Sequence, residues 1–475
     1  MGKVIEREAL GQAVASSAEH DGRGAWKSRK HGLPVARYTD PGFSQLEHDR
    51  LWPRTWQVAC RLEEIPNKGD YFVYQILDYS IIVVRQDDMS VKAFHNACPH
   101  RGTSLGVGSG HYSLGQIICP FHGWKWRLDG GNTYILDEAG FEPECMTKGA
   151  HDLRECRVAT FVNCMWINMD PAAVPFDEWI APIRGLIDPL LLDQMYFDWH
   201  MSFEVQGNWK VAQEAFFEGY HIAQTHPQLA ARSVRKKSAE MQNRFEVRML
   251  NFKTEVYPQG HGYQGATEGN YRGVGRFPKE WLEGMPEEEQ KEWFISYLEK
   301  FHGEQKSLIL EDDVEVARTM RNRPIPAGSN VDIEFQKVLR EHYALQGRPI
   351  ARAEDIARTN IIHLFPNYTF LAQFGNGIIY RTRPAPGNDP NVCIFDVWSV
   401  RTYPVGQQPP KPFTRHVKNP ADPKETVLIL AQDFLNIPRQ QLGMRSKGID
   451  ETVLHPVQEA LIANMHRAMD RLIGL

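Results

Sequence analysis

The sequence predicts an α+β protein in which a compact antiparallel β domain precedes a larger domain with its own antiparallel sheet and a long C-terminal helix. Short β-like runs separated by turn clusters fill residues 51–170. Three further β-like runs lie within 359–404, and an amphipathic helix is predicted over 451–475. We therefore divide the chain into an N-terminal segment (1–50), the β domain and a second domain (171–475).

The N-terminal segment is polar, and we expect it to pack on the second domain. Helical periodicity also starts at 208–225, where Pro227 should end the helix near its last residue. Two more polar helices, predicted over 278–301 and 331–347, indicate an insertion at about 255–350 within the second domain.

Composition narrows the classes of partner. The chain has 475 residues, a net charge of −5, 42% hydrophobic and 24% charged residues, which is ordinary for a globular protein. The mixed charges give no reason to expect nucleic acid, and no apolar run is long enough to span a membrane. The charged N-terminus is not a secretory signal. Seven scattered cysteines argue against a disulfide framework, so we expect a cytoplasmic protein.

Two loops of the β domain each pair a cysteine with a histidine. ACPHRG contains Cys98 and His100, CPFHGW contains Cys119 and His122, and 18 residues lie between His100 and Cys119. Thiolate and imidazole are both metal ligands, and the glycines and prolines around them are typical of tight loops. The two motifs together predict a metal centre.

Two kinds of centre use such ligands. A closed structural zinc site takes Cys2His2, but zinc fingers draw both cysteines from one knuckle and both histidines from the other. Here each loop supplies one of each, which favours a [2Fe–2S] cluster of the Rieske type, with the cysteines on one iron and the histidines on the other. Gly102 and Gly123 would let backbone N–H groups approach the sulfurs.

The helix predicted over 208–225 carries a second group of ligand-type side chains. Glu218 and His221 are three residues apart and share a helix face. His221 and His226 are five apart, about 140° around an ideal helix. Both histidines can face one metal only if the helix widens or frays near Pro227.

With both motifs in place, the chain resembles the catalytic α subunits of the aromatic-ring-hydroxylating oxygenase family. The resemblance extends from about residue 40 to the C-terminus. It implies that Cys98, His100, Cys119 and His122 hold a Rieske [2Fe–2S] cluster. It also implies that the second domain has a helix-grip fold of the START/Bet v1 type.

The resemblance further implies a mononuclear iron(II) in a 2-His-1-carboxylate facial triad. His221 and His226 would be two ligands, and Asp433 in AQDFLNIPRQQLGM would be the third, with Gln441 supporting it. Three ligands on one face leave the other face open for O2 and for water displaced by substrate. Glu218 takes the place of the acid that links the Rieske centre of one chain to the iron of the next in a head-to-tail trimer.

The implied function is that of a terminal oxygenase. Electrons would come from NAD(P)H through a separate reductase, with or without a ferredoxin, since the chain has no Rossmann fingerprint. O2 would hydroxylate an aromatic substrate, with cis-dihydroxylation favoured and the breakdown of aromatic hydrocarbons as the setting. A monooxygenase or an O- or N-demethylase is the alternative on the same scaffold, and a Rieske electron carrier is less favoured. The resemblance leaves open whether a small β subunit joins the homotrimer.

Overall fold

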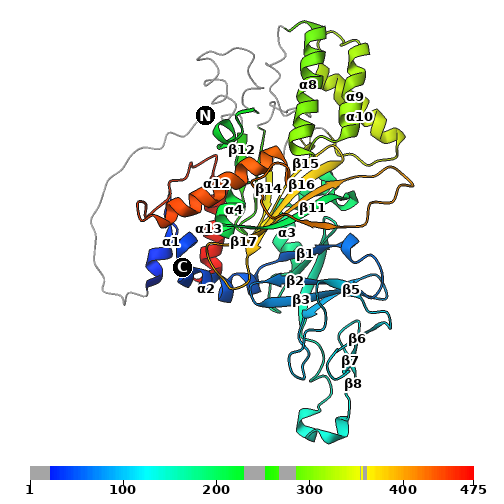
Figure 1. Cartoon of the computed structure of the whole chain (residues 1–475), viewed down its shortest axis with the longest axis vertical. Coiled ribbons are helices and arrows are strands. Elements are labelled where there is room, and N and C mark those ends of the chain that lie inside the picture. Colours follow the sequence, from blue (N-terminus) through cyan, green and yellow to red (C-terminus); the bar gives the residue numbers. More distant parts are fainter. Residues whose placement is uncertain (1–21, 31, 229–251, 267–284, 353–354, 357–360) are drawn as a thin grey trace.

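The chain forms two large β-sheets, a small third sheet and helices around the larger domain (Figure 1). The structure, a computed structural model, describes residues 22–30, 32–228, 252–266, 285–352, 355–356 and 361–475. In Figure 1 the small sheet lies at one end of the molecule, and the helices of the second domain lie towards the other. This arrangement confirms the predicted α+β fold. Among the described helices, none has the length and hydropathy that crossing a bilayer requires.

The first domain consists of a seven-stranded antiparallel sheet that carries the small sheet at one edge. The strand order of the large sheet is β1-β10-β9-β4-β3-β2-β5, and that of the small sheet is β6-β7-β8. The strands of the large sheet are β1 (Gln57–Arg61), β2 (Asp70–Ile76), β3 (Tyr79–Arg85), β4 (Val91–His95), β5 (Ser109–His111), β9 (Glu155–Phe161) and β10 (Cys164–Asn168). Those of the small sheet are β6 (Gln116–Ile118), β7 (Lys125–Arg127) and β8 (Asn132–Tyr134).

Strand β3 explains how the two sheets of the first domain stay together. Its run of consecutive apolar residues is buried on both faces, as expected for a strand covered from two sides. Ile81 and Val83 belong to the main core of the molecule. Ile82 and Val84 point the other way, into a small core that also contains Cys98 and other residues of the metal-binding loops. The strand therefore links the predicted metal loops to the rest of the protein.

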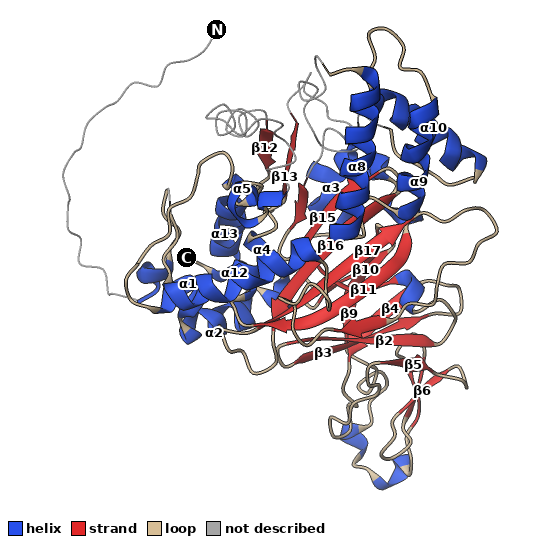
Figure 2. Ribbon diagram, turned by 45° about the horizontal axis from the view of Figure 1, so that its top comes forward, coloured by secondary structure: helices blue, strands red, loops and turns tan. Residues whose placement is uncertain are grey.

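The second domain is built on an eight-stranded sheet with the order β12-β13-β14-β15-β16-β17-β11-β18 (Figure 2). All its pairs are antiparallel except β11 with β18. Its strands are β11 (Tyr196–Val205), β12 (Phe252–Val256), β13 (Gly262–Ala266), β14 (Ile361–Leu364), β15 (Tyr368–Gln373), β16 (Asn376–Pro384), β17 (Cys393–Arg401) and β18 (Thr414–His416). The helices are α3 (Phe176–Ile187), α4 (Trp209–Glu214), α5 (Ile222–Thr225), α8 (Glu287–Gln305), α9 (Glu311–Thr319), α10 (Val331–Leu345), α12 (Leu428–Arg445) and α13 (Ala460–Ile473).

The predicted insertion at 255–350 was wrong at its start. Strand β13 and the last two residues of its partner β12 fall within this range but belong to the main sheet, because β12 pairs with β13 and β13 pairs with β14. Glycines obscured this strand in the sequence, since glycine has low strand propensity. The packing around Gly262 leaves no room for a side chain, because a Cβ would lie 2.5 Å from Leu461 and 2.6 Å from the carbonyl of Glu255. In the described part of this range, only α8, α9 and α10 protrude from the sheet (Figure 2).

The C-terminal helix is shorter than predicted. Helix α13 begins at Ala460, whereas the apolar pattern placed the start at 451. Pro456 lies in the segment before it, and the backbone N–H groups of Val457 and Gln458 donate to His455 Nδ1. Leu454 still packs on the main core from this non-helical segment, so the apolar pattern extended beyond the helix.

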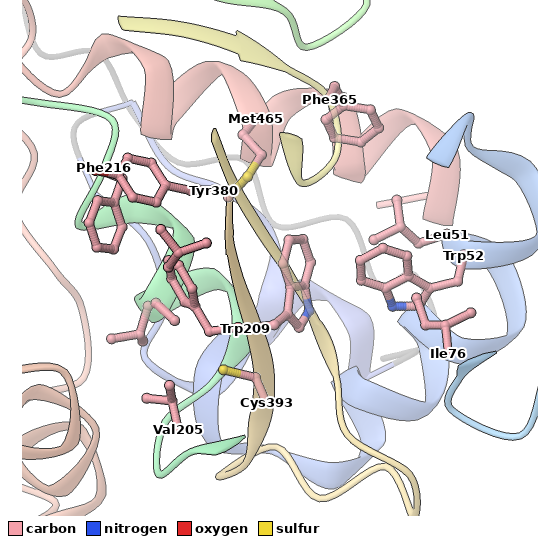
Figure 3. Packing of buried hydrophobic residues seen from close by; sticks show 14 of the residues in the cluster. Leu51, Trp52, Ile76, Val205, Trp209, Phe216, Phe365, Tyr380, Cys393 and Met465 are labelled. Atoms are coloured by element: carbon pink, nitrogen blue, oxygen red, sulfur yellow. The ribbon is translucent and has the colours of Figure 1, made fainter. Parts of the chain in front are cut away.

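The N-terminal segment packs on the second domain, through helices α1 (Ala36–Thr39) and α2 (Pro41–Arg50). Figure 3 shows the core at this junction, where the rings of Trp52 and Trp209 lie 4.9 Å apart. Buried charges join the same parts of the chain. Lys210 Nζ lies 2.6 Å from Glu47 Oε1, and both side chains are fully enclosed. Removing either partner would leave a buried unpaired charge.

Glu214 is a buried acid in this junction. Tyr38 Oη donates to its carboxylate at 3.1 Å, and His466 Nε2 lies 2.7 Å from Glu214 Oε1. Arg37 Nε donates to His466 Nδ1 at 2.8 Å, so the hydrogen of a neutral imidazole is on Nε2 and points at Glu214. Burial raises the pKa of Glu214 to about 8, and the hydrogen bond from Tyr38 and the charge of Lys210 counter it only in part.

The raised pKa of Glu214 predicts a pH-dependent loss of stability. Between about pH 4.5 and pH 8 the folded chain holds a proton that the unfolded chain has released, so the free energy of unfolding falls as pH rises. Glu214→Gln has a neutral side chain there at every pH. Its free energy of unfolding should therefore rise relative to that of wild type by a few kcal/mol between pH 5 and pH 8.5. Denaturant titrations at several pH values, followed by circular dichroism, measure this. Glu204→Gln on the exposed side of β11 is the control and should not change the slope; equal slopes for all three proteins would contradict the prediction.

Candidate metal centres

The two Cys–His loops have the same backbone turn. Gly102 N donates to Cys98 O at 2.8 Å in the first loop, and Gly123 N donates to Cys119 O at 3.1 Å in the second. In each loop the cysteine N–H donates to the carbonyl five residues further on, at 2.9 Å. The two glycines have φ angles of +76° and +74°, a conformation that favours glycine. The glycines thus close the loops, and the N–H groups of Gly102 and Gly123 go to carbonyl oxygens instead of to sulfur.

These turns bring the four predicted cluster ligands together. The thiols of Cys98 and Cys119 are buried in the same small core. Burial raises the pKa of the Cys98 thiol, the backbone N–H groups of His100 and Arg101 lower it, and the neighbouring Cys119 adds to the rise. The rings of His100 and His122 have their centroids 4.6 Å apart on the partly exposed side. Two enclosed sulfurs and two outer imidazoles fit a [2Fe–2S] cluster whose histidine-bound iron is nearer the solvent. N–H groups directed at sulfur are also what such a cluster uses to tune its potential.

Trp124 is a supporting residue that the sequence analysis missed. Its ring stacks on His100 with centroids 4.9 Å apart and planes inclined by 11°. Its side chain is buried, and its carbonyl accepts the N–H of Cys119. The tryptophan that ends the second motif was the available signal. The stacked ring of Trp124 holds the plane of His100, one of the predicted imidazole ligands.

The prediction of one helix over 208–225 was wrong. Helix α4 ends at Glu214 and α5 begins at Ile222, although the second helix ends at Thr225 as predicted from Pro227. Glu218 lies in the break, where its carboxylate accepts the backbone N–H groups of Tyr220 and of His221, the latter at 3.1 Å. Free N–H groups at a helix start are commonly satisfied in this way.

The break allows both histidines to face Asp433 on α12. The distance from Asp433 Oδ1 to His226 Nε2 is 3.1 Å and to His221 Nε2 is 3.6 Å. One ligand atom from each of the three lies within 4.8 Å of the others. Ligands bound to one metal at about 2.1 Å lie about 3 Å apart when adjacent, so the three side chains fit one metal ion with modest adjustment. Two imidazoles and one carboxylate are the donor set of non-haem iron(II) oxygenases.

The outer nitrogens of the two histidines have different partners. His221 Nδ1 lies 2.7 Å from Glu218 Oε1, whereas His226 Nδ1 lies 2.9 Å from Gln432 Oε1. Burial lowers the pKa of His221, but the hydrogen bond and charge of Glu218, together with Asp433, outweigh it and raise the pKa to about 9. In both histidines Nε2 faces the carboxylate, so Nε2 is the nitrogen available to a metal.

Gln441 does not have the supporting position that the sequence suggested. Its Oε1 accepts the N–H of Asn208 at 3.1 Å, and its Nε2 donates to Tyr38 O at 3.1 Å and to Asn391 Oδ1 at 3.0 Å. Asp433 and Gln441 are eight residues apart on α12, about 80° around the helix axis, so they face different neighbours. Gln441 therefore anchors the start of α4, and Gln432 contacts the metal-binding group instead.

The two centres lie in different parts of the chain. The Cys–His loops follow β4 and join β6 to β7, at the end of the molecule that carries the small sheet (Figure 1). The His–His–Asp group lies between α4, α5 and α12, and Figure 1 shows α4 and α12 away from that end.

Comparison with known protein families gives two matches. A model of the ring hydroxylating alpha subunit (catalytic domain) matches residues 192–475, and a model of the Rieske [2Fe-2S] domain matches residues 55–138. Each match contains one of the two groups of ligands described above.

Curated relatives include both monooxygenases and dioxygenases. The chain is 31% identical over 199 residues to the glycine betaine monooxygenase oxygenase subunit of Chromohalobacter salexigens, covering 42% of this chain and 44% of that protein. It is 28% identical over 197 residues to the anthranilate 1,2-dioxygenase large subunit of Acinetobacter baylyi, covering 40% and 41%. The matched region is thus less than half the length of these relatives.

Solved structures of similar fold cover nearly the whole chain. A quaternary ammonium Rieske monooxygenase, whose structure addresses carnitine oxidation, aligns with a TM-score of 0.61 at 17% identity over 97% of this chain and 100% of that one. Naphthalene 1,2-dioxygenase from Rhodococcus sp. aligns with a TM-score of 0.60 at 17% identity over 96% of both chains. At such identities the likeness is one of fold.

Proposed function

The chain belongs to the family of ring-hydroxylating oxygenase alpha subunits, and from this membership we propose that it is a terminal oxygenase that transfers oxygen from O2 to an organic substrate. The observation that carries the proposal is the presence, in one chain, of a Cys2His2 group in twin loops and a separate His–His–Asp group. In this family a Rieske cluster supplies single electrons, and a mononuclear iron(II) activates dioxygen. A Rieske electron carrier would not need the second group.

In this proposal each group of side chains has a separate role. Cys98, His100, Cys119 and His122 hold the cluster, with the two histidines towards the surface where an electron donor can approach. His221, His226 and Asp433 hold the iron from one side. Their outer hydrogen bonds, to Glu218 and Gln432, keep both Nε2 atoms directed at the metal.

The separation of the two centres supports a homotrimer in which neighbouring chains cooperate. Within one chain the small sheet and α12 lie in different parts of the molecule (Figure 1). We place Glu218 at the junction, where it holds His221 of its own chain and has remaining lone pairs for a histidine of the next chain. The electrons come from NAD(P)H through a separate reductase. The scattered unpaired cysteines support a cytoplasmic setting.

An aromatic substrate with cis-dihydroxylation is the favoured reaction. Phe434, directly after Asp433 on α12, packs in an aromatic part of the core, with ring centroids 4.8 Å from Phe203 and 5.0 Å from Phe395. Such surroundings suit an apolar ring and exclude water. The setting would be the breakdown of aromatic hydrocarbons.

A monooxygenase is the second candidate, and one observation favours it. Among the matches described above, the one with the highest identity over its aligned region acts on glycine betaine, a quaternary ammonium compound. Hydroxylation next to such a group, or demethylation of an O- or N-methyl group, would use the same iron site.

A substrate panel with isotopically labelled oxygen tests the proposal. Purified protein, a generic reductase and NADH are incubated under ¹⁸O₂ with aromatic hydrocarbons, aromatic acids, methoxylated rings and betaines. A product with two labelled oxygens supports dihydroxylation, and one labelled oxygen or loss of a methyl group supports the second candidate. NADH oxidation without any labelled product across the panel would count against both.

Glu218→Gln separates the charge of this residue from its backbone contacts. The amide oxygen can still accept the N–H groups of Tyr220 and His221, so the turn should persist, but the negative charge beside His221 Nδ1 is lost. We expect oxidation of the reduced Rieske centre, after mixing with O2 and substrate, to slow by between about 10- and 100-fold. Stopped-flow absorption measures this rate. Glu204→Gln is the control, and wild-type kinetics in Glu218→Gln would argue against the proposed role.

A further inference from the structure

His226, the second of the two histidines predicted to bind iron, is held by a pair of glutamine side chains from distant parts of the chain. Gln432 Oε1 lies 2.9 Å from His226 Nδ1 and also accepts from Gln228 Nε2 at 2.7 Å. In return, Gln432 Nε2 donates to Gln228 Oε1 at 3.1 Å. The two amides therefore form a reciprocal pair, with one oxygen shared between the partner amide and the imidazole.

The reciprocal pair couples the orientation of the Gln432 amide to that of Gln228. If Gln432 turned over, its NH2 group would point at His226 Nδ1, which would then have to be an acceptor. A neutral imidazole with an acceptor Nδ1 has its hydrogen on Nε2, the atom that faces Asp433 Oδ1 at 3.1 Å. That hydrogen would block a metal. Turning Gln432 alone would also break both bonds to Gln228, so the pair opposes this turn.

The Gln432 amide gives His226 an outer partner that differs in charge from the partner of His221. His221 Nδ1 has a carboxylate partner in Glu218, whereas His226 Nδ1 has a neutral amide. Asp433 and Glu218 together bring two negative charges to the centre, equal to the charge of Fe²⁺, and Gln432 adds none. Histidine ligands are usually oriented by such an outer partner, and its loss commonly weakens metal binding by about 10- to 100-fold.

We propose that Gln432, locked by Gln228, is the positioning residue that sets the tautomer and ring orientation of His226 for metal binding. The inference rests on the proposed function, because it takes His226 as an iron ligand. It assigns a role to two residues outside the predicted ligand set, one of them on the segment directly after α5 and the other on α12.

Metal affinity tests this role without relying on turnover. Protein that retains the Rieske cluster but is depleted of the mononuclear iron is titrated anaerobically with Fe²⁺, and the Kd is measured by equilibrium dialysis. We expect Gln432→Leu, which removes the acceptor, to raise the Kd by about 10- to 100-fold. Gln432→Glu restores an acceptor oxygen and should bring the Kd back to within a few-fold of wild type. Gln228→Leu unlocks the amide and should give a smaller loss.

Asn436→Leu is the matched control. Asn436 lies one turn further along α12, and its Nδ2 donates to Thr225 Oγ1 at the end of α5 at 3.3 Å. The substitution therefore removes a nearby amide contact of α12 without touching a ligand. Its Kd should equal that of wild type. Each variant is also loaded with Fe²⁺ and treated with nitric oxide, and the electron paramagnetic resonance spectrum of the adduct should change in Gln432→Leu but not in Asn436→Leu. The absorption of the Rieske cluster reports whether the first domain of each variant is folded, and the circular dichroism spectrum reports the same for the chain as a whole.

Two results would overturn the inference. One is a wild-type Kd and spectrum in Gln432→Leu; the other is an equal loss in Gln432→Leu and Gln432→Glu, which would show that volume matters and the acceptor does not. Should Gln432→Leu lose its cluster as well, the comparison of Gln228→Leu with Asn436→Leu decides, and equal affinities would overturn it. Wild-type protein that binds no Fe²⁺ in this titration would instead defeat the proposed function itself.

Discussion

Replacing His226 by alanine should abolish product formation and lower the iron content from about three atoms per chain to about two, with the Rieske cluster intact. The reason is the small number of ligands. Three side chains hold the metal in the proposed site, and His226 Nε2 lies nearer to Asp433 Oδ1, at 3.1 Å, than His221 Nε2 does, at 3.6 Å. Loss of an outer partner of a ligand already costs about 10- to 100-fold, so loss of the ligand itself should cost more than about 100-fold in activity.

Metal analysis together with visible absorption checks this result. The cluster absorbs in the visible range and its loops belong to the other domain, so its signal should be the same in His226→Ala and in wild type. His416→Ala, an exposed histidine on β18, is the control and should keep about three irons and full activity. Turnover in His226→Ala comparable to wild type would remove the basis for an oxygenase at this site.

The ligands themselves could be predicted because their signals are local. Each Cys–His loop closes on itself within a few residues, through a glycine with positive φ and a cysteine carbonyl. The spacing of cysteine, histidine and glycine therefore carries most of the geometry. The fold class could be predicted for a similar reason, since strands such as β3 show as uninterrupted apolar runs.

What the sequence did not reveal depends on contacts between distant segments. The break between α4 and α5 is held by one carboxylate that binds two backbone N–H groups, and helical periodicity continues through it. Helix α12 was missed because Pro438 lies inside it, where proline normally disfavours a helix. Gln228 and Gln432 are 204 residues apart, and no spacing rule connects them. Gln441 was assigned to the wrong neighbour because its rotation around an unpredicted helix was unknown.

The second large effect is expected at a buried ion cluster that joins the two domains. Asp396 on β17 accepts from Arg381 Nε at 2.9 Å and is also bonded to Arg383. Arg381 Nη1 in turn donates to the carbonyls of Val58 at 2.7 Å and Ala59 at 3.1 Å, both on β1 of the first domain. Only 2% of Asp396 is exposed. The carboxylate therefore balances two arginines, one of which holds the domains together.

Asp396→Ala should destabilise the protein by about 3–5 kcal/mol, because it leaves buried arginine charge without a counter-ion. Thermal unfolding followed by circular dichroism and by cluster absorption should show a melting temperature lower by several degrees, with both signals lost together. Glu292→Ala is the control: its pair with Arg321 has two contacts of 2.7 and 3.0 Å but is exposed on both sides. Exposed pairs contribute little to stability, so a similar loss in both variants would contradict the argument.

The stability of Asp396→Asn relative to wild type at different pH values tests whether the two arginines stabilise the ionised form of Asp396. Burial alone would raise the pKa of Asp396, but Arg383 and Arg381 outweigh it and hold the pKa well below its usual range. Because the pKa of Asp396 is lower in the folded chain than the unfolded value of about 3.9, its ionised form stabilises the fold fully above that value. This stabilisation is lost as pH falls towards the folded pKa. The gap in unfolding free energy between wild type and Asp396→Asn should thus stay constant from pH 6 to pH 8 and narrow below about pH 4. A gap that instead widened on acidification would mean that the buried carboxyl is protonated in the folded chain, and the two arginines would then need another counter-charge.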